Sequence, residues 1–215
     1  MNTAVDIPSR GALNMIEAHT SPATGVIFHP DDATVGYSTS LDHTLKTLDL
    51  VTGVAVDSRQ TSHSLLSLCT ISPGGTGHVV AVGTAARHIT LLDPRVDAKS
   101  ASVMTLRGHT NKVVSLSADP HSQYGLVSGS HDGTVRVWDI RNYREGTREE
   151  GGRVGEATFI IDRESAKGDE GEATRKVAGE GVKVLSVVWD KDIGIVSGSE
   201  DRKVQINKGS RVVNM

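Results

Sequence analysis

Cysteine is almost absent from this sequence of 215 residues, and neither sign of charge dominates. The single cysteine, Cys69, excludes a disulfide within the chain and a zinc site built from several cysteines. A chain with so little cysteine is typical of a reducing compartment. The net charge of −3 provides no broad basic surface for non-specific binding of nucleic acid. These absences exclude disulfide-rich secreted domains and strongly basic nucleic-acid binders.

Long apolar segments are also missing. Residues Met1–Arg10 contain no apolar core of the kind found in signal peptides, so we expect no signal peptide. Residues 60–86 carry no Asp, Glu, Lys or Arg, but they include Pro73, several glycines and two histidines. A membrane-spanning helix does not tolerate so many helix breakers and polar groups. We therefore expect strands and a turn in this segment, and no contact with a membrane.

The sequence repeats itself. Positions 90 residues apart match in the pairs His19 and His109, Pro30 and Pro120, Ser38 and Ser128, and Asp42 and Asp132. An intervening copy runs from His63 to Asp93, and Val196–Asp201 resembles Val127–Asp132, which adds a fourth copy. Repeats of this length indicate an array of similar structural units. The predicted repeats cover residues 12–58, 59–106, 107–161 and 177–213.

Each copy is predicted to form short β-strands. In the third copy, apolar runs predict strands at Val113–Ala118, Gly125–Ser128 and Thr134–Trp138. The Asp-Gly pair between the last two runs is a hairpin signal. No segment has a sustained helical period of apolar residues, so the predicted fold class is all-β.

Residues 142–180 interrupt this pattern with many Gly, Glu and Arg residues. Such a composition buries too little apolar surface to offset the chain entropy lost on folding, so most of the segment is expected to be disordered. Thr158–Ile161 is predicted to be the outer strand of the third unit. The flexible charged insertion is then residues 162–176.

Gly108-His109, Ser128-Gly129-Ser130-His131-Asp132-Gly133 and Trp138-Asp139 resemble the WD-repeat family in type and spacing. The other copies match less well, because Ala18-His19 and Leu48-Asp49 replace the two dipeptides in the first copy. The resemblance implies a β-propeller of about four blades, each a four-stranded sheet. This is a partial ring beside the seven blades of complete members.

The resemblance also implies a structural tetrad of His109, Ser128, Asp132 and Trp138 in one buried hydrogen-bond network. The donors and acceptors of these side chains are complementary. Ser, His and Asp also occur together in hydrolases, but no oxyanion-hole loop follows Ser128. We therefore expect no enzyme activity and no catalytic residues.

No metal ion or cofactor is expected. His19, His63 and His109 occupy equivalent positions in different copies and therefore cannot converge on one ion. The glycine-rich residues 74–77 lack the lysine and the following helix of a phosphate-binding loop.

A narrower resemblance concerns Gly108–Val113, the charged insertion and Ser197–Lys208. These features are similar to the C-terminal half of the WD-repeat ribosome-biogenesis factor of the PeBoW complex. That family implies a scaffold for large ribosomal subunit assembly and rRNA processing in the nucleolus, within the nucleus. Its partners would be the block-of-proliferation and pescadillo proteins and pre-ribosomal particles. The family's ubiquitin-like domain, which engages the midasin ATPase, has no counterpart in the sequence.

Two alternatives remain open, a generic WD-repeat scaffold and a substrate receptor of a cullin-type ubiquitin ligase. Trp138-Asp139-Ile140-Arg141 resembles the WDxR box of such receptors, and Leu92-Asp93-Pro94-Arg95 is a degraded copy. The candidate partner-contact residues are Lys46, Arg87, Arg95, Lys112, Arg136, Arg141 and Lys203.

An arc of four blades leaves its two ends without a neighbour. A terminal blade then exposes a sheet edge and an apolar face. We expect either a piece of a longer protein, or closure with another chain, or self-association of the isolated chain.

Overall fold

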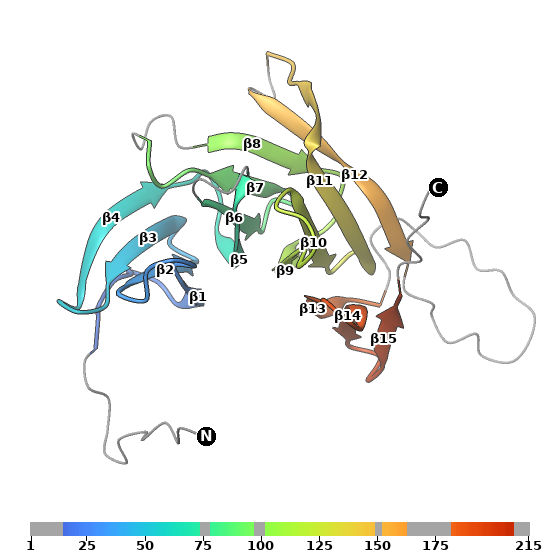
Figure 1. Ribbon diagram of the computed structural model, residues 1–215, viewed down its shortest axis with the longest axis horizontal. Coiled ribbons are helices and arrows are strands. Elements are labelled where there is room, and N and C mark those ends of the chain that lie inside the picture. Colours follow the sequence, from blue (N-terminus) through green and yellow to red (C-terminus); the bar gives the residue numbers. More distant parts are fainter. Residues whose placement is uncertain (1–14, 74–77, 97–101, 149–151, 163–181, 209–215) are drawn as a thin grey trace, which may run out of the picture.

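A computed structural model describes residues 15–73, 78–96, 102–148, 152–162 and 182–208. These residues form fifteen strands, and no α-helix occurs among them. The prediction of an all-β chain is therefore confirmed. Likewise, this part of the chain contains no helix long and apolar enough to cross a membrane. The strands form sheets that stand one after another along an arc (Figure 1).

The strands fall into four successive groups, which we call blades 1 to 4. Blade 1 contains β1 (Ala23–Phe28), β2 (Val35–Ser40), β3 (Thr44–Asp49) and β4 (Val54–Gln60), and blade 2 contains β5 (Leu65–Ile71), β6 (Val79–Thr84), β7 (Ile89–Leu92) and β8 (Ser102–Arg107). Blade 3 contains β9 (Val113–Ala118), β10 (Gly125–Ser130), β11 (Thr134–Glu145) and β12 (Arg153–Asp162), and the described strands of blade 4 are β13 (Val184–Asp190), β14 (Gly194–Ser199) and β15 (Val204–Asn207). Within each blade, consecutive strands pair antiparallel, which confirms a partial β-propeller.

Blades 2 and 3 are joined into one sheet of eight strands, which the sequence did not predict. The outer strand β12 pairs parallel with β8, and Val154 lies opposite Thr105. The join exists because β12 begins at Arg153, ahead of the predicted start at Thr158. Val154, in this additional stretch, is buried.

The β11–β12 hairpin extends into the segment that was expected to be disordered. Tyr143 and Arg144 pair with Gly155 and Val154 on the neighbouring strand. The Arg153 guanidinium lies 4.9 Å from the centre of the Tyr143 ring. Cross-strand contacts therefore order residues whose composition alone favours disorder. Of the predicted insertion, Asp162 is the last residue of β12, and residues 163–176 lie outside the described residues.

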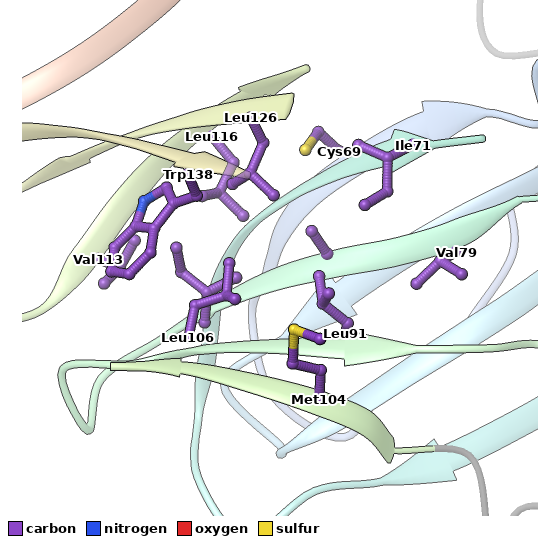
Figure 2. Close-up of a cluster of buried hydrophobic side chains, with 12 residues drawn as sticks. Cys69, Ile71, Val79, Leu91, Met104, Leu106, Val113, Leu116, Leu126 and Trp138 are labelled. Atoms are coloured by element: carbon purple, nitrogen blue, oxygen red, sulfur yellow. The ribbon is translucent and has the colours of Figure 1, made fainter. Parts of the chain in front are cut away.

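Each blade has a near face, turned toward the preceding blade in the chain, and a far face, turned toward the following blade. The largest buried cluster joins the far face of blade 2 to the near face of blade 3 (Figure 2). Trp138, Leu116 and Leu126 of blade 3 pack there with Leu91 and Leu106 of blade 2. Close-packed apolar faces thus hold successive blades together.

Two smaller clusters repeat this arrangement. Between blades 1 and 2, Tyr37 and Leu45 pack against Leu65 and Val80. The cluster between blades 3 and 4 contains Val127, Val135, Val184, Val187 and Ile195. The faces of the blades are therefore equivalent surfaces, used in the same way at each junction.

Candidate functional site

The predicted tetrad lies between β9, β10 and β11 as a connected chain of hydrogen bonds. The Trp138 indole N–H donates to Ser128 Oγ at 2.8 Å, and Ser128 Oγ lies 2.7 Å from His109 Nε2. His109 Nδ1 lies 2.8 Å from Asp132 Oδ2. The structure therefore brings all four residues together.

One assignment of protons satisfies the whole chain. His109 is neutral, its Nδ1–H donates to Asp132, and its Nε2 accepts the Ser128 hydroxyl proton. Burial lowers the pKa of His109, although the hydrogen bond to Asp132 opposes this effect. Burial alone would raise the pKa of Asp132, but hydrogen bonds from His109, Thr110 and Thr134 hold it well below its usual range.

The same groups in a hydrolase would need access to a substrate. Ser128 is 0 % exposed, and its oxygen already accepts the Trp138 N–H. The arrangement ties the loop before β9 to β10 and β11. Its chemistry is therefore that of a fully satisfied buried network.

Asp132 also shapes the β10–β11 hairpin. Its second oxygen, Oδ1, accepts bonds from the backbone N–H and the hydroxyl of Thr134. The next residue, Gly133, has a φ of 82°, which glycine adopts without strain. His43, Arg87 and Arg202 occupy the equivalent turn positions with φ of 69°, 71° and 66°. The left-handed turn is thus common to all four blades, whether or not glycine is present.

A second network, which sequence reasoning missed, occupies the same place in blade 1. His19 Nε2 lies 2.8 Å from Ser38 Oγ, and His19 Nδ1 lies 3.1 Å from Asp42 Oδ2. Bonds from Thr44, Thr20 and His19 hold the pKa of Asp42 below its usual range, although burial acts in the opposite direction. The 90-residue spacing contained this signal, because it aligns all three residues with the tetrad. Leu48 takes the place of the tryptophan.

A polar junction between blades 1 and 2 was also missed. His78 Nε2 lies 2.5 Å from Asp31 Oδ2 of blade 1, and His78 Nδ1 lies 2.5 Å from Ser72 Oγ.

The described residues contain no cluster of His, Cys, Asp or Glu that could hold a metal ion. Burial raises the pKa of the Cys69 thiol to about 12, so this cysteine is not a nucleophile at neutral pH.

Arg59 of β4 forms a second junction between the same blades. Its guanidinium donates to the carbonyl oxygens of Asp93, Pro94 and Val96 of blade 2 at 3.3, 2.8 and 2.6 Å. Its Nε also donates to Asp57 at 2.6 Å. Because the acceptors are mostly backbone carbonyls, no sequence pattern marks them as partners.

The candidate partner-contact residues do not form one patch. Arg87, Lys112 and Lys203 are exposed near the hairpins that join the second and third strands of each blade. His131 of such a hairpin donates its N–H to the Lys112 carbonyl, which places these loops together. Arg141 lies at the opposite end of the strands, where its guanidinium stacks 4.7 Å from the centre of the Tyr124 ring.

Arg95 and Arg141 share one local arrangement. Each pairs with the aspartate two residues earlier, Arg95 with Asp93 at 2.7 Å and Arg141 with Asp139 at 2.5 Å. The arginine of each WDxR-like segment is therefore already engaged in an ion pair with the aspartate of the same segment.

Lys46 and Arg136, two further candidates, are half-buried on equivalent strands. A side chain on Gly108 would meet the Arg136 guanidinium at 2.5 Å, and Gly108 has a φ of 148°. Gly108 thus lets the Arg136 guanidinium pack close to the backbone beside His109, and its positive φ is one that other residues rarely adopt.

Comparison with known proteins agrees with these features. The model of the WD domain, G-beta repeat, matches residues 11–49 and 100–139, which include both polar networks. The chain belongs to the WD-repeat family. The WD repeats are thus the source of the tetrad, the turn and the glycine before His109.

Curated relatives match nearly the whole chain. Ribosome biogenesis protein YTM1 of Podospora anserina is 54 % identical over 98 % of this chain and 44 % of its own length. The Aspergillus niger protein of that name is 54 % identical over 100 % of this chain and 42 % of its own. The Phaeosphaeria nodorum protein is 57 % identical over 94 % and 41 %. The chain therefore spans less than half the length of these relatives.

Proposed function

We propose that this chain is a non-enzymatic scaffold in ribosome biogenesis. The observation that carries the proposal is the identity of 54 % with ribosome biogenesis protein YTM1 over nearly the whole chain. The buried network supports a scaffold, because its serine and histidine are engaged with each other and closed to substrate. The protein acts in assembly of the large subunit and rRNA processing, in the nucleolus.

The partners we propose are the block-of-proliferation and pescadillo proteins of the PeBoW complex, together with pre-ribosomal particles. Exposed cations at the strand ends are the candidate contacts, because rim charges steer association and set partner choice. Arg87 and Lys112 lie at one end of the strands, and Arg95 and Arg141 lie at the other. Because the two sets lie at opposite ends of the strands, substituting each set separately shows at which end the partners bind.

Affinity purification of the tagged chain from fungal cells, followed by mass spectrometry, tests the proposal. Recovery of the two PeBoW proteins with large-subunit particles is the expected result. Recovery of a cullin adaptor without them would overturn it in favour of the ligase receptor. The double variants Arg87→Glu/Lys112→Glu and Arg95→Ala/Arg141→Ala identify the binding end, and Val51→Lys in the exposed β3–β4 turn is the matched control.

A further inference from the structure

One end of the strands, which we call the hairpin end, carries the turns between the second and third strands of every blade. These turns are residues 41–43, 85–88, 131–133 and 200–203. A backbone hydrogen bond ties each turn to the loop that leads into the first strand, in the pairs Leu41 and Pro22, Ala85 and Ser64, His131 and Lys112, and Glu200 and Lys183. The hairpins and these entry loops therefore form one surface at the strand ends.

In blades 2 and 3 the hairpin end is basic. Arg87 in the β6–β7 hairpin, Arg107 at the end of β8 and Lys112 before β9 are all exposed. None of these three cations forms an ion pair with another described residue. The acidic side chain of these loops, Asp132, is buried in the tetrad and bonded to His109. The three cations are therefore available to an anionic ligand.

The opposite end of the strands is acidic. Its turns carry the aspartates Asp31, Asp32, Asp119, Asp190 and Asp192. Two of its arginines, Arg95 and Arg141, pair with the aspartates two residues earlier and so add little net charge. The net charge of −3 thus conceals a separation between a basic and an acidic end. Such a distribution directs an anionic ligand to one end of the molecule.

Two histidines of the hairpin end lie in the field of these cations. Burial lowers the pKa of His131, and the charges of Lys183 and Lys112 lower it further. Burial likewise lowers the pKa of His88, and the charge of Arg107 acts in the same direction. Cations from blades 2, 3 and 4 therefore act on one continuous surface.

The hairpin end of blades 2 and 3 lacks the centre of a protein–protein interface. Residues 85–88, 107–112 and 131–134 contain no exposed large hydrophobic side chain and no Phe, Tyr or Trp. Stable protein interfaces are built around apolar and aromatic anchors, and proteins that hold the bases of a single strand stack them on aromatic rings. Long cationic side chains without such anchors suit the phosphate groups of a nucleic-acid backbone.

We propose that the hairpin end of blades 2 and 3 binds single-stranded RNA through its phosphate backbone, without reading the bases. Arg87, Arg107 and Lys112 supply the phosphate contacts. The choice of RNA among anionic ligands rests on the proposed function in ribosome biogenesis, which this inference deepens by assigning a surface. The contacts stand on loops at the strand ends, so the packing of one blade on another leaves them open.

Fluorescence polarisation of a labelled oligouridine, titrated with the purified chain, tests the proposal between about 50 and 200 mM salt. Binding at low salt that weakens as the salt rises is expected, because each phosphate contact releases counterions. Oligocytidine should bind with similar affinity, and a strong preference for either oligonucleotide would overturn contact through the backbone alone. The absence of binding at low salt would overturn the proposal. Tighter binding of a polyglutamate peptide would overturn it in favour of an acidic protein segment.

A charge-reversed variant locates the contact. Arg87→Glu/Arg107→Glu/Lys112→Glu is expected to weaken RNA binding about tenfold or more, with an unchanged circular dichroism spectrum. The slope of log affinity against log salt should become shallower by about 2, because three phosphate contacts are lost. Lys112→Glu alone, at an exposed position, should change the slope by about 0.7 and tests the same contact if the triple variant does not fold. Unchanged affinity and slope in these variants would overturn the proposal.

The matched control changes the net charge by the same amount at the opposite end. Arg144→Glu/Arg153→Glu/Lys191→Glu replaces exposed cations of the β11–β12 hairpin and the β13–β14 turn and should bind RNA almost as the unchanged chain does. Equal weakening in both triple variants would contradict the assigned surface. RNA binding is measured without partner proteins, so its failure is distinguishable from a failure to recover the PeBoW proteins in the purification.

Discussion

At the scale of single residues, the tetrad predicted from the sequence matches the hydrogen bonds of the structure residue by residue. Its four residues follow from one motif, because a buried network needs complementary donors and acceptors at fixed spacings. The blade 1 network escaped prediction because Leu48 and Ala18 replace two motif residues, although His19, Ser38 and Asp42 make the same bonds. The hydrogen bonds of Arg59 were not predicted because their acceptors are backbone carbonyl oxygens, which no side-chain pattern in the sequence identifies.

Asp132→Ala tests the structural role of the tetrad. The substitution leaves His109 Nδ1–H and the N–H groups of Thr110 and Thr134 without their acceptor. Loss of this acceptor inside the protein should cost about 3 kcal/mol, which lowers the thermal midpoint by about 10 °C. Calorimetry measures the change, with Asp162→Ala at the exposed end of β12 as a control for lost charge. An unchanged midpoint in Asp132→Ala would refute the stabilising role.

The lowered pKa of His109 in the folded chain predicts that stability depends on pH. Its pKa is lowered by burial in the folded chain, whereas the unfolded chain binds the proton near pH 6.5. The unfolded state therefore gains this proton first, so the free energy of unfolding should fall as the pH drops from 7 toward 5. Urea titrations at several pH values measure the slope. His109→Asn should reduce the slope without abolishing it, since burial also lowers the pKa of His88 and His131.

At the scale of elements, both ends of β9 and the starts of β10 and β11 were predicted correctly, whereas β10 and β11 end later and β12 begins earlier than predicted. β9 and β11 begin at the predicted Val113 and Thr134, because apolar alternation marks buried strands. β11 continues to Glu145, past the last apolar alternation, because Tyr143 and Arg144 find partners on β12. Pairing between charged or aromatic neighbours depends on which strand lies opposite, and local composition does not contain that information.

The hydrogen bonds of Arg59 are expected to stabilise the junction between β4 and blade 2, and Arg59→Lys tests this. Arg59→Lys keeps the charge but cannot donate to three carbonyl oxygens in the fixed geometry of a guanidinium. We expect a loss of about 2–3 kcal/mol. Hydrogen exchange should accelerate most in β4 and in residues 93–96, where the acceptors lie. Arg144→Lys on the exposed β11–β12 hairpin is the matched control, and equal effects of the two variants would contradict the assigned role.

At the scale of the whole molecule, the repeat spacing predicted a series of similar units but not how unequal their junctions are. In a repeat protein, each unit is stabilised mainly by its neighbours, so stability varies along the array. Blades 2 and 3 share the largest apolar cluster and also pair through β8 and β12. Blade 4 contacts the rest of the described chain mainly through the smaller cluster around Val187. The spacing contained no sign of this difference, because it depends on the size of each buried cluster.

These unequal junctions predict unequal unfolding. Leu106→Ala should cost about 3 kcal/mol and lower the protection of amides throughout blades 2 and 3, because Leu106 is buried in their shared cluster. Val187→Ala should instead accelerate exchange in β13, β14 and β15 while β6 and β10 stay protected. Hydrogen exchange followed by mass spectrometry distinguishes the two patterns. If Val187→Ala lowered protection equally in every blade, the array would unfold as one cooperative unit and the ranking of junctions would be wrong.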